Sequence, residues 1–166
     1  MDAIFKRRSI RRYRKEPVPV ELIKKLLKAG MAAPSAGNEQ PWHFIVVRNK
    51  ETLYRLSKLS PHANMLKDAP VGIVVCGDLN AEVYKGFWVQ DCSAATENLL
   101  IEATYLGLGG VWLGVYPLDE RIEYVRKELG VPSHIVPFAV IPIGYPAQQL
   151  SPADRYNESK VHYERW

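Results

Sequence analysis

The densest group of chemically useful side chains in this chain is a run of basic residues at its start. Residues 1–15 hold seven lysines or arginines against Asp2, a local charge of +6 in a chain whose net charge is +4. Within this run, Arg7-Arg8-Ser9-Ile10-Arg11 places guanidinium groups and a hydroxyl at a predicted junction between helix and loop. These groups suit a phosphate monoester, because each charge-assisted hydrogen bond contributes about 1.5–3 kcal/mol. The same charges also suit a nucleic-acid arm or a solvated basic face, and composition does not choose among the three.

Two further segments are rich in small residues that expose main-chain groups. Pro34-Ser35-Ala36-Gly37-Asn38 is typical of a loop, and Gly109-Gly110-Val111-Trp112-Leu113-Gly114 contains three glycines. Because glycine has no Cβ, such a stretch lets a ligand approach the main chain closely. The second segment also fits a simple helix end that leads into a buried strand, and one stretch can serve both purposes.

The remaining reactive residue types do not form a recognisable catalytic or metal-binding motif. The histidines at 43, 62, 134 and 162 are scattered, and neither HxxxH nor HExxH occurs. Cys76 falls in a predicted buried strand and Cys92 in a predicted helix, without CxxC spacing. We therefore expect two buried free thiols, no metal site and no catalytic side chain.

The composition bounds the class of protein. A chain of 166 residues with 47% hydrophobic and 24% charged positions predicts one globular domain over residues 1–166. Its apolar runs are too short for a membrane helix, and its start lacks the pattern of a secretory signal, so a cytoplasmic location is expected. The Arg-rich start resembles an organelle transit peptide, but it continues without a composition break into a capped helix.

The elements that must position these residues alternate irregularly between helix and strand. We expect helices over residues 2–9, 19–32, 52–58, 87–105 and 118–129, and strands over residues 43–47, 71–76, 111–115 and 138–143. The unbroken apolar run at 71–76 predicts a strand covered by helices on both faces, with 87–105 as the central helix. No glycine-rich fingerprint follows the first strand, which favours an α+β fold over a doubly wound one.

The tail over residues 147–166 is predicted to need a partner surface. Its apolar side chains follow neither a helical nor a strand period, so the tail could not bury them alone. We expect the tail to pack along another surface, and a second subunit is the favoured one.

Taken together, these segments resemble the nitroreductase family over nearly the whole chain. The basic run at 7–11, the loop from Ala33 to Phe44, the segment from Gly107 to Gly114 and the tail around Arg155 occur in the family's order. The resemblance implies a three-layer α+β fold, with a central, mostly antiparallel sheet flanked by helices and a C-terminal tail extending onto a partner subunit. It also implies an FMN-dependent oxidoreductase that works as an obligate homodimer with FMN sites at the interface. NADH or NADPH would reduce the FMN, which would then reduce a nitroaromatic, quinone or similar small-molecule acceptor in a ping-pong cycle.

The resemblance also assigns roles to individual residues. The ribityl-phosphate end of FMN would be held by Arg7, Arg8, Ser9 and Arg11, with Arg155 as a further phosphate ligand. The isoalloxazine ring, bound mainly to the other subunit, would be lined by Pro34, Ser35, Ala36 and Asn38, with Gln40 hydrogen-bonding nearby. Main-chain groups on the N5 side of the ring would come from Val111, Leu113 and Gly114. Within the loop, Pro41, Trp42 and Phe44 are expected to pack the core.

Two alternatives stay open at this point. Specialised relatives that dehalogenate aromatics or fragment the flavin share the same FMN motifs. Only the short stretches 60–69 and 79–86 are available for a lid over the flavin, so an open, permissive site is expected and the substrate preference stays open. A nucleic-acid-binding module would use the same basic run, but the interleaved aromatics of single-strand binders are not evident, so no nucleic-acid partner is expected.

Overall fold

The computed structural model describes residues 3–166, and Asp2 of the predicted first helix lies outside the described residues. The helices are α1 (Ala3–Lys6), α2 (Val20–Met31), α3 (Lys50–Leu56), α4 (Trp88–Tyr105) and α5 (Asp119–Leu129). The strands are β1 (Trp42–Val47), β2 (Val71–Asp78), β3 (Gly109–Gly110), β4 (Leu113–Gly114) and β5 (Ile135–Gly144). Three short 3-10 turns are η1 (Ala36–Asn38), η2 (Asn64–Lys67) and η3 (Glu158–Lys160). Among the helices so described, none is long and apolar enough to cross a membrane.

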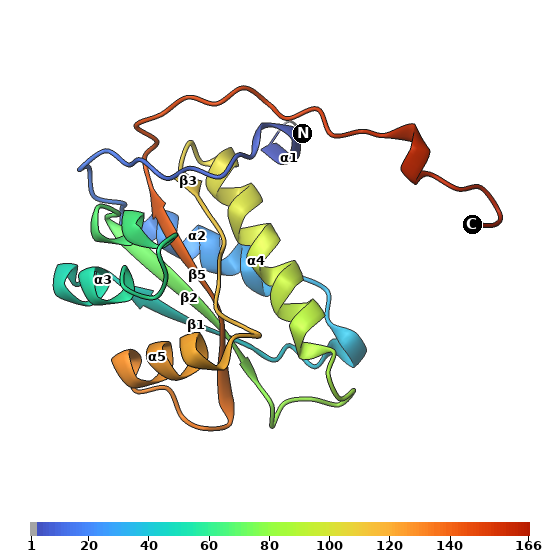
Figure 1. Cartoon of the computed structure of the whole chain (residues 1–166), viewed down its shortest axis with the longest axis horizontal. Coiled ribbons are helices and arrows are strands. Elements are labelled where there is room, and N and C mark those ends of the chain that lie inside the picture. Colours follow the sequence, from blue (N-terminus) through green and yellow to red (C-terminus); the bar gives the residue numbers. More distant parts are fainter. Residues whose placement is uncertain (1–2) are drawn as a thin grey trace.

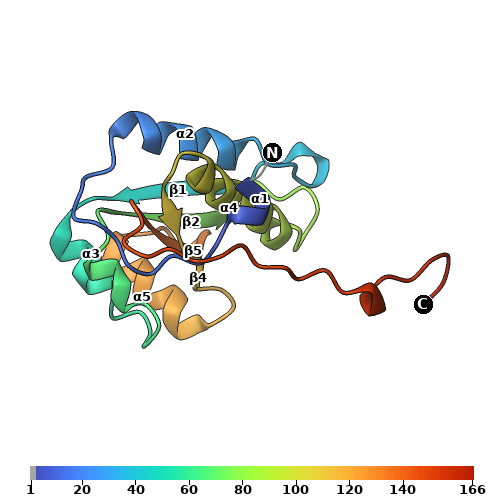
Figure 2. The same cartoon turned by 90° about the horizontal axis from the view of Figure 1, so that it is seen from above.

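One antiparallel sheet forms the middle layer of the molecule. Its strand order is β1-β2-β5-β3, and β4 also pairs with β5. Helices α2 and α4 cover one face of the sheet, and α3 and α5 cover the other (Figures 1 and 2). The predicted α+β fold with an antiparallel sheet between helical layers is therefore confirmed.

The central strand β2 divides the core into two parts. Ile73 and Val75 face the cluster built with α2 and α4, whereas Val74 and Cys76 face the cluster built with α3 and α5. This alternation follows from the two-residue period of a strand, and all four side chains are fully buried. Burial of each such apolar side chain stabilises the fold by about 1.5–3 kcal/mol. The prediction of a strand covered on both faces is confirmed.

Several elements differ from the prediction in extent or burial. The strand expected to be buried at 43–47 lies at the sheet edge, so Val46 is 37% exposed and only Trp42 and Val47 of β1 are buried. Of the strand expected at 111–115, only Leu113–Gly114 (β4) is formed, because Val111 and Trp112 do not pair with β5, and a further short strand, β3, precedes the expected range. Helix α3 begins earlier than expected because the Asn49 side chain accepts a hydrogen bond from the N–H of Thr52 at 2.9 Å.

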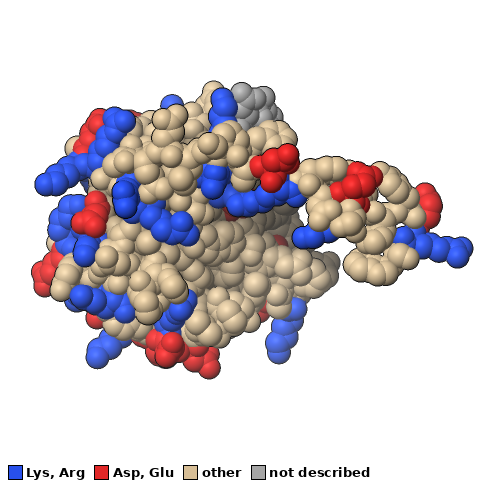
Figure 3. Space-filling model, turned by 45° about the horizontal axis from the view of Figure 1, so that its top comes forward, with Lys and Arg blue, Asp and Glu red and all other residues tan. Residues whose placement is uncertain are grey.

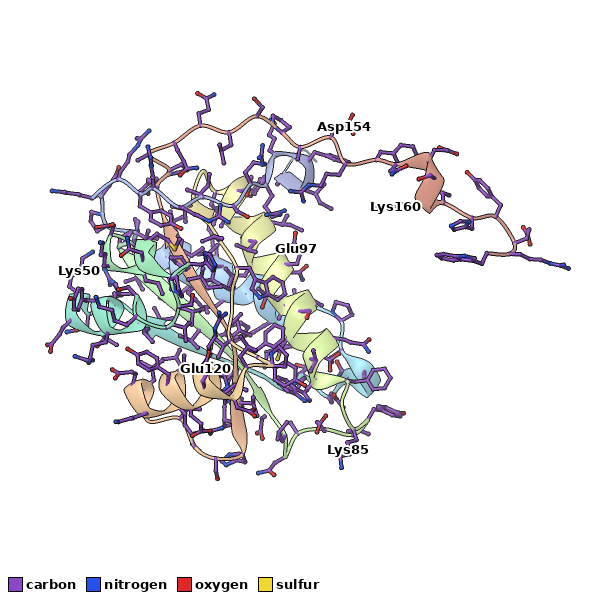
Figure 4. The ribbon with its side chains drawn as sticks, in the orientation of Figure 1. Lys50, Lys85, Glu97, Glu120, Asp154 and Lys160 are labelled. Atoms are coloured by element: carbon purple, nitrogen blue, oxygen red, sulfur yellow. The ribbon has the colours of Figure 1, made fainter. Side chains whose placement is uncertain are left out.

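The C-terminal tail runs along the top of the molecule and then leaves it (Figures 1 and 2). The aromatic side chains of Tyr156, Tyr163 and Trp166 are 73%, 77% and 101% exposed. Figure 4 shows Asp154 above α1 and Lys160 farther out, beyond the body of the protein. As predicted, the tail does not bury its own apolar groups.

Candidate functional site

A cavity of about 560 Å³ lies between β4, the first turn of α5 and the loop that follows α3. Its main-chain wall is the segment from Val111 to Gly114, and its polar lining comprises Arg11, Ser60, His62 and Arg121. The cavity therefore joins the basic N-terminal segment to the glycine-containing segment, the two features that the sequence marks for ligand binding.

The glycines beside the cavity serve two different purposes. A Cβ added to Gly109 would lie 2.5 Å from Cγ1 of Ile10, so this glycine allows the N-terminal segment to pack tightly on β3. The contact is closed by the N–H of Ile10, which donates to the carbonyl oxygen of Gly110 at 2.9 Å. A Cβ added to Gly114 would meet no atom within 4 Å. The space in front of the Gly114 main chain is therefore open, whereas the space in front of Gly109 is filled by Ile10.

Arg121 is a site residue that the sequence analysis missed. Its Nη1 donates to the carbonyl oxygen of Gly114 at 2.9 Å, so it fixes the main-chain wall. Its Nε is buried and has no hydrogen-bond acceptor among the described residues. A buried donor left unpaired costs about 1–3 kcal/mol. The available signal was its position in the first turn of α5, where the helix dipole disfavours a cation.

The predicted phosphate-binding arginines are placed on different neighbours. Arg7 pairs through Nε with Oε1 of Glu97 on α4 at 3.1 Å, and Nη1 of Arg8 donates to the carbonyl oxygen of Ser151 in the tail. Arg11 is exposed and lines the cavity, and Ser9 forms a bridge with β3. Figure 3 shows Lys and Arg side chains spread over the face seen from the top of Figure 1, with Asp and Glu side chains among them, and Figure 4 shows Glu97 midway along α4.

Arg155 lies in the exposed tail and is not part of the cavity lining. Within one chain, the cavity thus brings together four of the predicted site residues, namely Arg11, Val111, Leu113 and Gly114. It does not bring in Arg7, Arg8, Ser9 or Arg155.

The predicted flavin-facing loop lies elsewhere in the same chain. It forms the turn η1 at the N-terminal end of α4, the end farther from α1 (Figure 1). Asp91 at that end accepts a hydrogen bond from the N–H of Ala36 at 3.0 Å. Gly37, Asn38 and Gln40 have φ values of 53°, 59° and 46°, in the left-handed region. The structure therefore separates Pro34, Ser35, Ala36, Asn38 and Gln40 from the cavity of their own chain.

Both cysteines lie in the core. Burial raises the pKa of the Cys76 thiol to about 12 and also raises the pKa of Cys92, so both stay protonated and unreactive at neutral pH. The two free thiols are buried, as predicted. Trp42 is buried in the cluster on the α4 side and Phe44 packs against that cluster, which confirms their predicted core role. Within residues 3–166, no group of three or more His, Cys, Asp or Glu could hold a metal ion.

Comparison with known proteins places this geometry in a family. The sequence model of the nitroreductase family matches residues 4–64 and 57–145. A protein of Methanothermobacter thermautotrophicus, provisionally named NADH dehydrogenase/NAD(P)H nitroreductase, is 51% identical over 100% of this chain and 87% of its own length.

Two solved structures have the same fold. One, from Parabacteroides distasonis and provisionally named in the same way, has a TM-score of 0.96 and 47% identity over 99% of this chain and 97% of its own. Another, from Desulfovibrio desulfuricans and provisionally named a nitroreductase, contains FMN. It has a TM-score of 0.85 and 34% identity over 99% of this chain and 96% of its own.

Proposed function

The chain belongs to the nitroreductase family, and on that premise we propose that it binds FMN and passes electrons from NADH or NADPH to nitroaromatic, quinone or similar acceptors by a ping-pong mechanism. The observation that carries the proposal is the cavity in which the open main chain at Gly114 lies beside two arginines, Arg11 and Arg121. This arrangement offers main-chain groups and positive charge and has no Cβ to block close approach.

The residues of the cavity fit the ring of a flavin. The unpaired Nε–H of Arg121 needs an acceptor, and the carbonyl oxygens and ring nitrogens of a flavin are acceptors. The space in front of Gly114 lets a flat ring approach the main chain from Val111 to Gly114. When bound, FMN supplies the chemistry by accepting a hydride from the donor and passing reducing equivalents to the acceptor.

The protein's own contribution is to position the cofactor. Arg11 lies at the cavity and Arg7, Arg8 and Ser9 precede it directly, so we assign this segment to the ribityl-phosphate end. Val111, Leu113 and Gly114 hold the N5 side through their main chain. Arg155 completes the phosphate contacts from the tail. We assign no proton-transferring side chain, because positioning and charge suffice for hydride transfer to a flavin.

We further propose that each site is shared between two subunits. The loop containing Pro34, Ser35, Ala36, Asn38 and Gln40 lies at the far end of α4 from the N-terminal basic segment, so it can line only a flavin held by another chain. The tail carries exposed aromatic side chains that need a second surface. A homodimer supplies both, and it places the loop of one subunit over the cavity of the other.

Steady-state kinetics test the proposed reaction order. Initial rates are measured with NADH varied at several fixed concentrations of a quinone, and again with NADPH. A ping-pong cycle gives parallel double-reciprocal lines, because the donor leaves before the acceptor enters. Lines that intersect to the left of the vertical axis show that both substrates are bound at once, and they would contradict the proposal.

A further inference from the structure

Arg121 differs from the other partly buried arginines of the described residues in having a buried N–H without an acceptor. Arg55 pairs with Glu51 and Glu128, and Arg126 pairs with Glu123 and also donates to carbonyl oxygens that include that of Ile135. For Arg121, by contrast, the described part of the chain offers no carboxylate within ion-pair distance, and one N–H stays buried without an acceptor. The guanidinium of Arg121 is therefore a cation at the cavity wall that has one buried N–H without a partner among the described residues.

The surroundings of Arg121 strengthen this contrast. Arg121 lies in the first turn of α5, where the dipole of the helix disfavours positive charge. The neighbouring acidic residues Asp119 and Glu120 are exposed, and their negative charges suit the dipole of the helix at this end. Arg121 is partly buried and lines the cavity instead. If Arg121 only held the carbonyl oxygen of Gly114, one N–H group would suffice. A second buried N–H without an acceptor would then serve no purpose.

We propose that Arg121 is a positioning residue that stabilises the reduced form of the bound flavin more than the oxidised form. This inference rests on the proposed FMN-dependent function. The hydride taken from NAD(P)H carries two electrons and one proton, so NAD(P)H becomes NAD(P)⁺ and the flavin ring gains one negative charge. A fixed cation beside the ring favours the state that carries that charge.

Arg11 and Arg121, the two arginines of the cavity, differ in how strongly their charges act on a bound ring. Arg11 is exposed, so water and salt screen its charge. Arg121 is partly buried and is held in place by the carbonyl oxygen of Gly114, so its charge acts through a medium of lower dielectric constant. Its fork also fits the task, because one N–H holds the main chain while another remains for the ring.

The test compares the affinities for oxidised and reduced FMN in the wild type and in three variants. R121Q removes the charge and keeps a polar side chain, whereas R121K keeps the charge. K127Q removes one charge from an exposed position on the same helix and serves as the matched control. Dissociation constants for FMN are measured in air and under anaerobic reduction, and the midpoint potential of the bound cofactor is measured separately. Thermal unfolding checks that each variant is folded.

We expect R121Q to weaken binding of reduced FMN about tenfold more than binding of oxidised FMN. For a two-electron couple this ratio corresponds to a midpoint potential about 30 mV lower. R121K should restore most of the potential, and K127Q should leave it unchanged.

Equal weakening of both states by R121Q, or a potential that R121K does not restore, would overturn the inference and leave Arg121 with a structural role. That result would leave the proposed function standing. Failure of the wild-type protein to bind FMN would instead remove the proposed function itself, so the two failures are distinguishable.

Discussion

The carboxyl groups of Glu39 and Asp91 lie beside each other at the base of the loop that contains η1, so each affects the pKa of the other. Each has one buried oxygen, Oε1 of Glu39 and Oδ2 of Asp91, that no donor of the described residues reaches. Oε2 of Glu39 accepts from the N–H groups of Val83 and Tyr84 at 2.7 Å and 3.0 Å. Glu39 and Asp91 therefore link α4, the η1 loop and the 79–86 loop, and a proton shared between their two unpaired oxygens would pair both of them.

This pair predicts that the loop loosens as pH rises. Burial raises the pKa of Asp91, and the neighbouring Glu39 raises it further. Burial works against ionisation of Glu39 as well, but the N–H groups of Tyr84 and Val83 lower its pKa overall. Because the pKa of Asp91 is raised in the folded state, its contribution is present at low pH and is lost as pH rises through that value.

D91N should abolish the loss of stability that occurs as pH rises through the pKa of Asp91. Asparagine does not ionise, and it can still accept from the N–H of Ala36 and donate to Glu39. Thermal or urea unfolding across pH measures the effect, whose slope is at most about 1.4 kcal/mol per pH unit. The exposed carboxylate variant D68N should behave as the wild type. A D91N protein with unchanged pH dependence would show that the pair shares no proton.

Substitutions at two glycines should separate the open wall of the cavity from its packed neighbour. G114A should leave the unfolding free energy nearly unchanged, because the added methyl group enters open space. G114F should fill part of the cavity and weaken FMN binding at least tenfold without loss of fold. G109A should destabilise the protein by about 1–3 kcal/mol through its clash with Ile10. Tight FMN binding by G114F would place the flavin away from this wall.

The shared site predicts that two inactive variants can complement each other. R11E reverses a charge at the cavity, and the double variant S35A/N38G trims the η1 loop while glycine tolerates the left-handed φ at position 38. Each homodimer should lose most activity. A purified heterodimer with one chain of each kind has one intact site and should recover up to about half of the wild-type rate. Recovery no greater than the mean of the two parents would contradict sharing.

Removal of residues 151–166 should weaken self-association. The deletion takes away the exposed aromatic side chains of Tyr156, Tyr163 and Trp166 and the Ser151 carbonyl that Arg8 contacts, but it leaves the two buried core clusters intact. We therefore expect a folded chain that sediments more slowly than the wild type and binds FMN less tightly. A truncated protein with unchanged sedimentation would show that the tail does not hold the subunits together.

The fold was largely predictable because its signals are local. The apolar run of β2, the glycines that end α4 and α5, and the amphipathic face of α2 each reflect short-range periodicity or capping. The edge position of β1 depends on which strands pair, so its exposed Val46 could not be anticipated from the segment alone.

The candidate site was predictable only in part. Arg11 and the segment from Val111 to Gly114 carry recognisable residue types, and the structure does bring them together. Arg121 belongs to an ordinary-looking amphipathic helix, and its unpaired N–H emerges only when α5 packs beside β4. The juxtaposition of Glu39 and Asp91 likewise depends on residues 52 positions apart, a separation at which sequence patterns carry no contact information.

FMN-dependent activity is tested most directly by anaerobic titration of the purified, FMN-reconstituted protein with NADH, followed by visible absorption. The proposed function predicts a flavin spectrum whose chromophore, released by heat, is FMN. The absorbance of this flavin should be bleached by about one equivalent of NADH per bound flavin and should recover when a quinone is added. A colourless protein that FMN cannot reconstitute, or a bound flavin that neither NADH nor NADPH reduces, would contradict it.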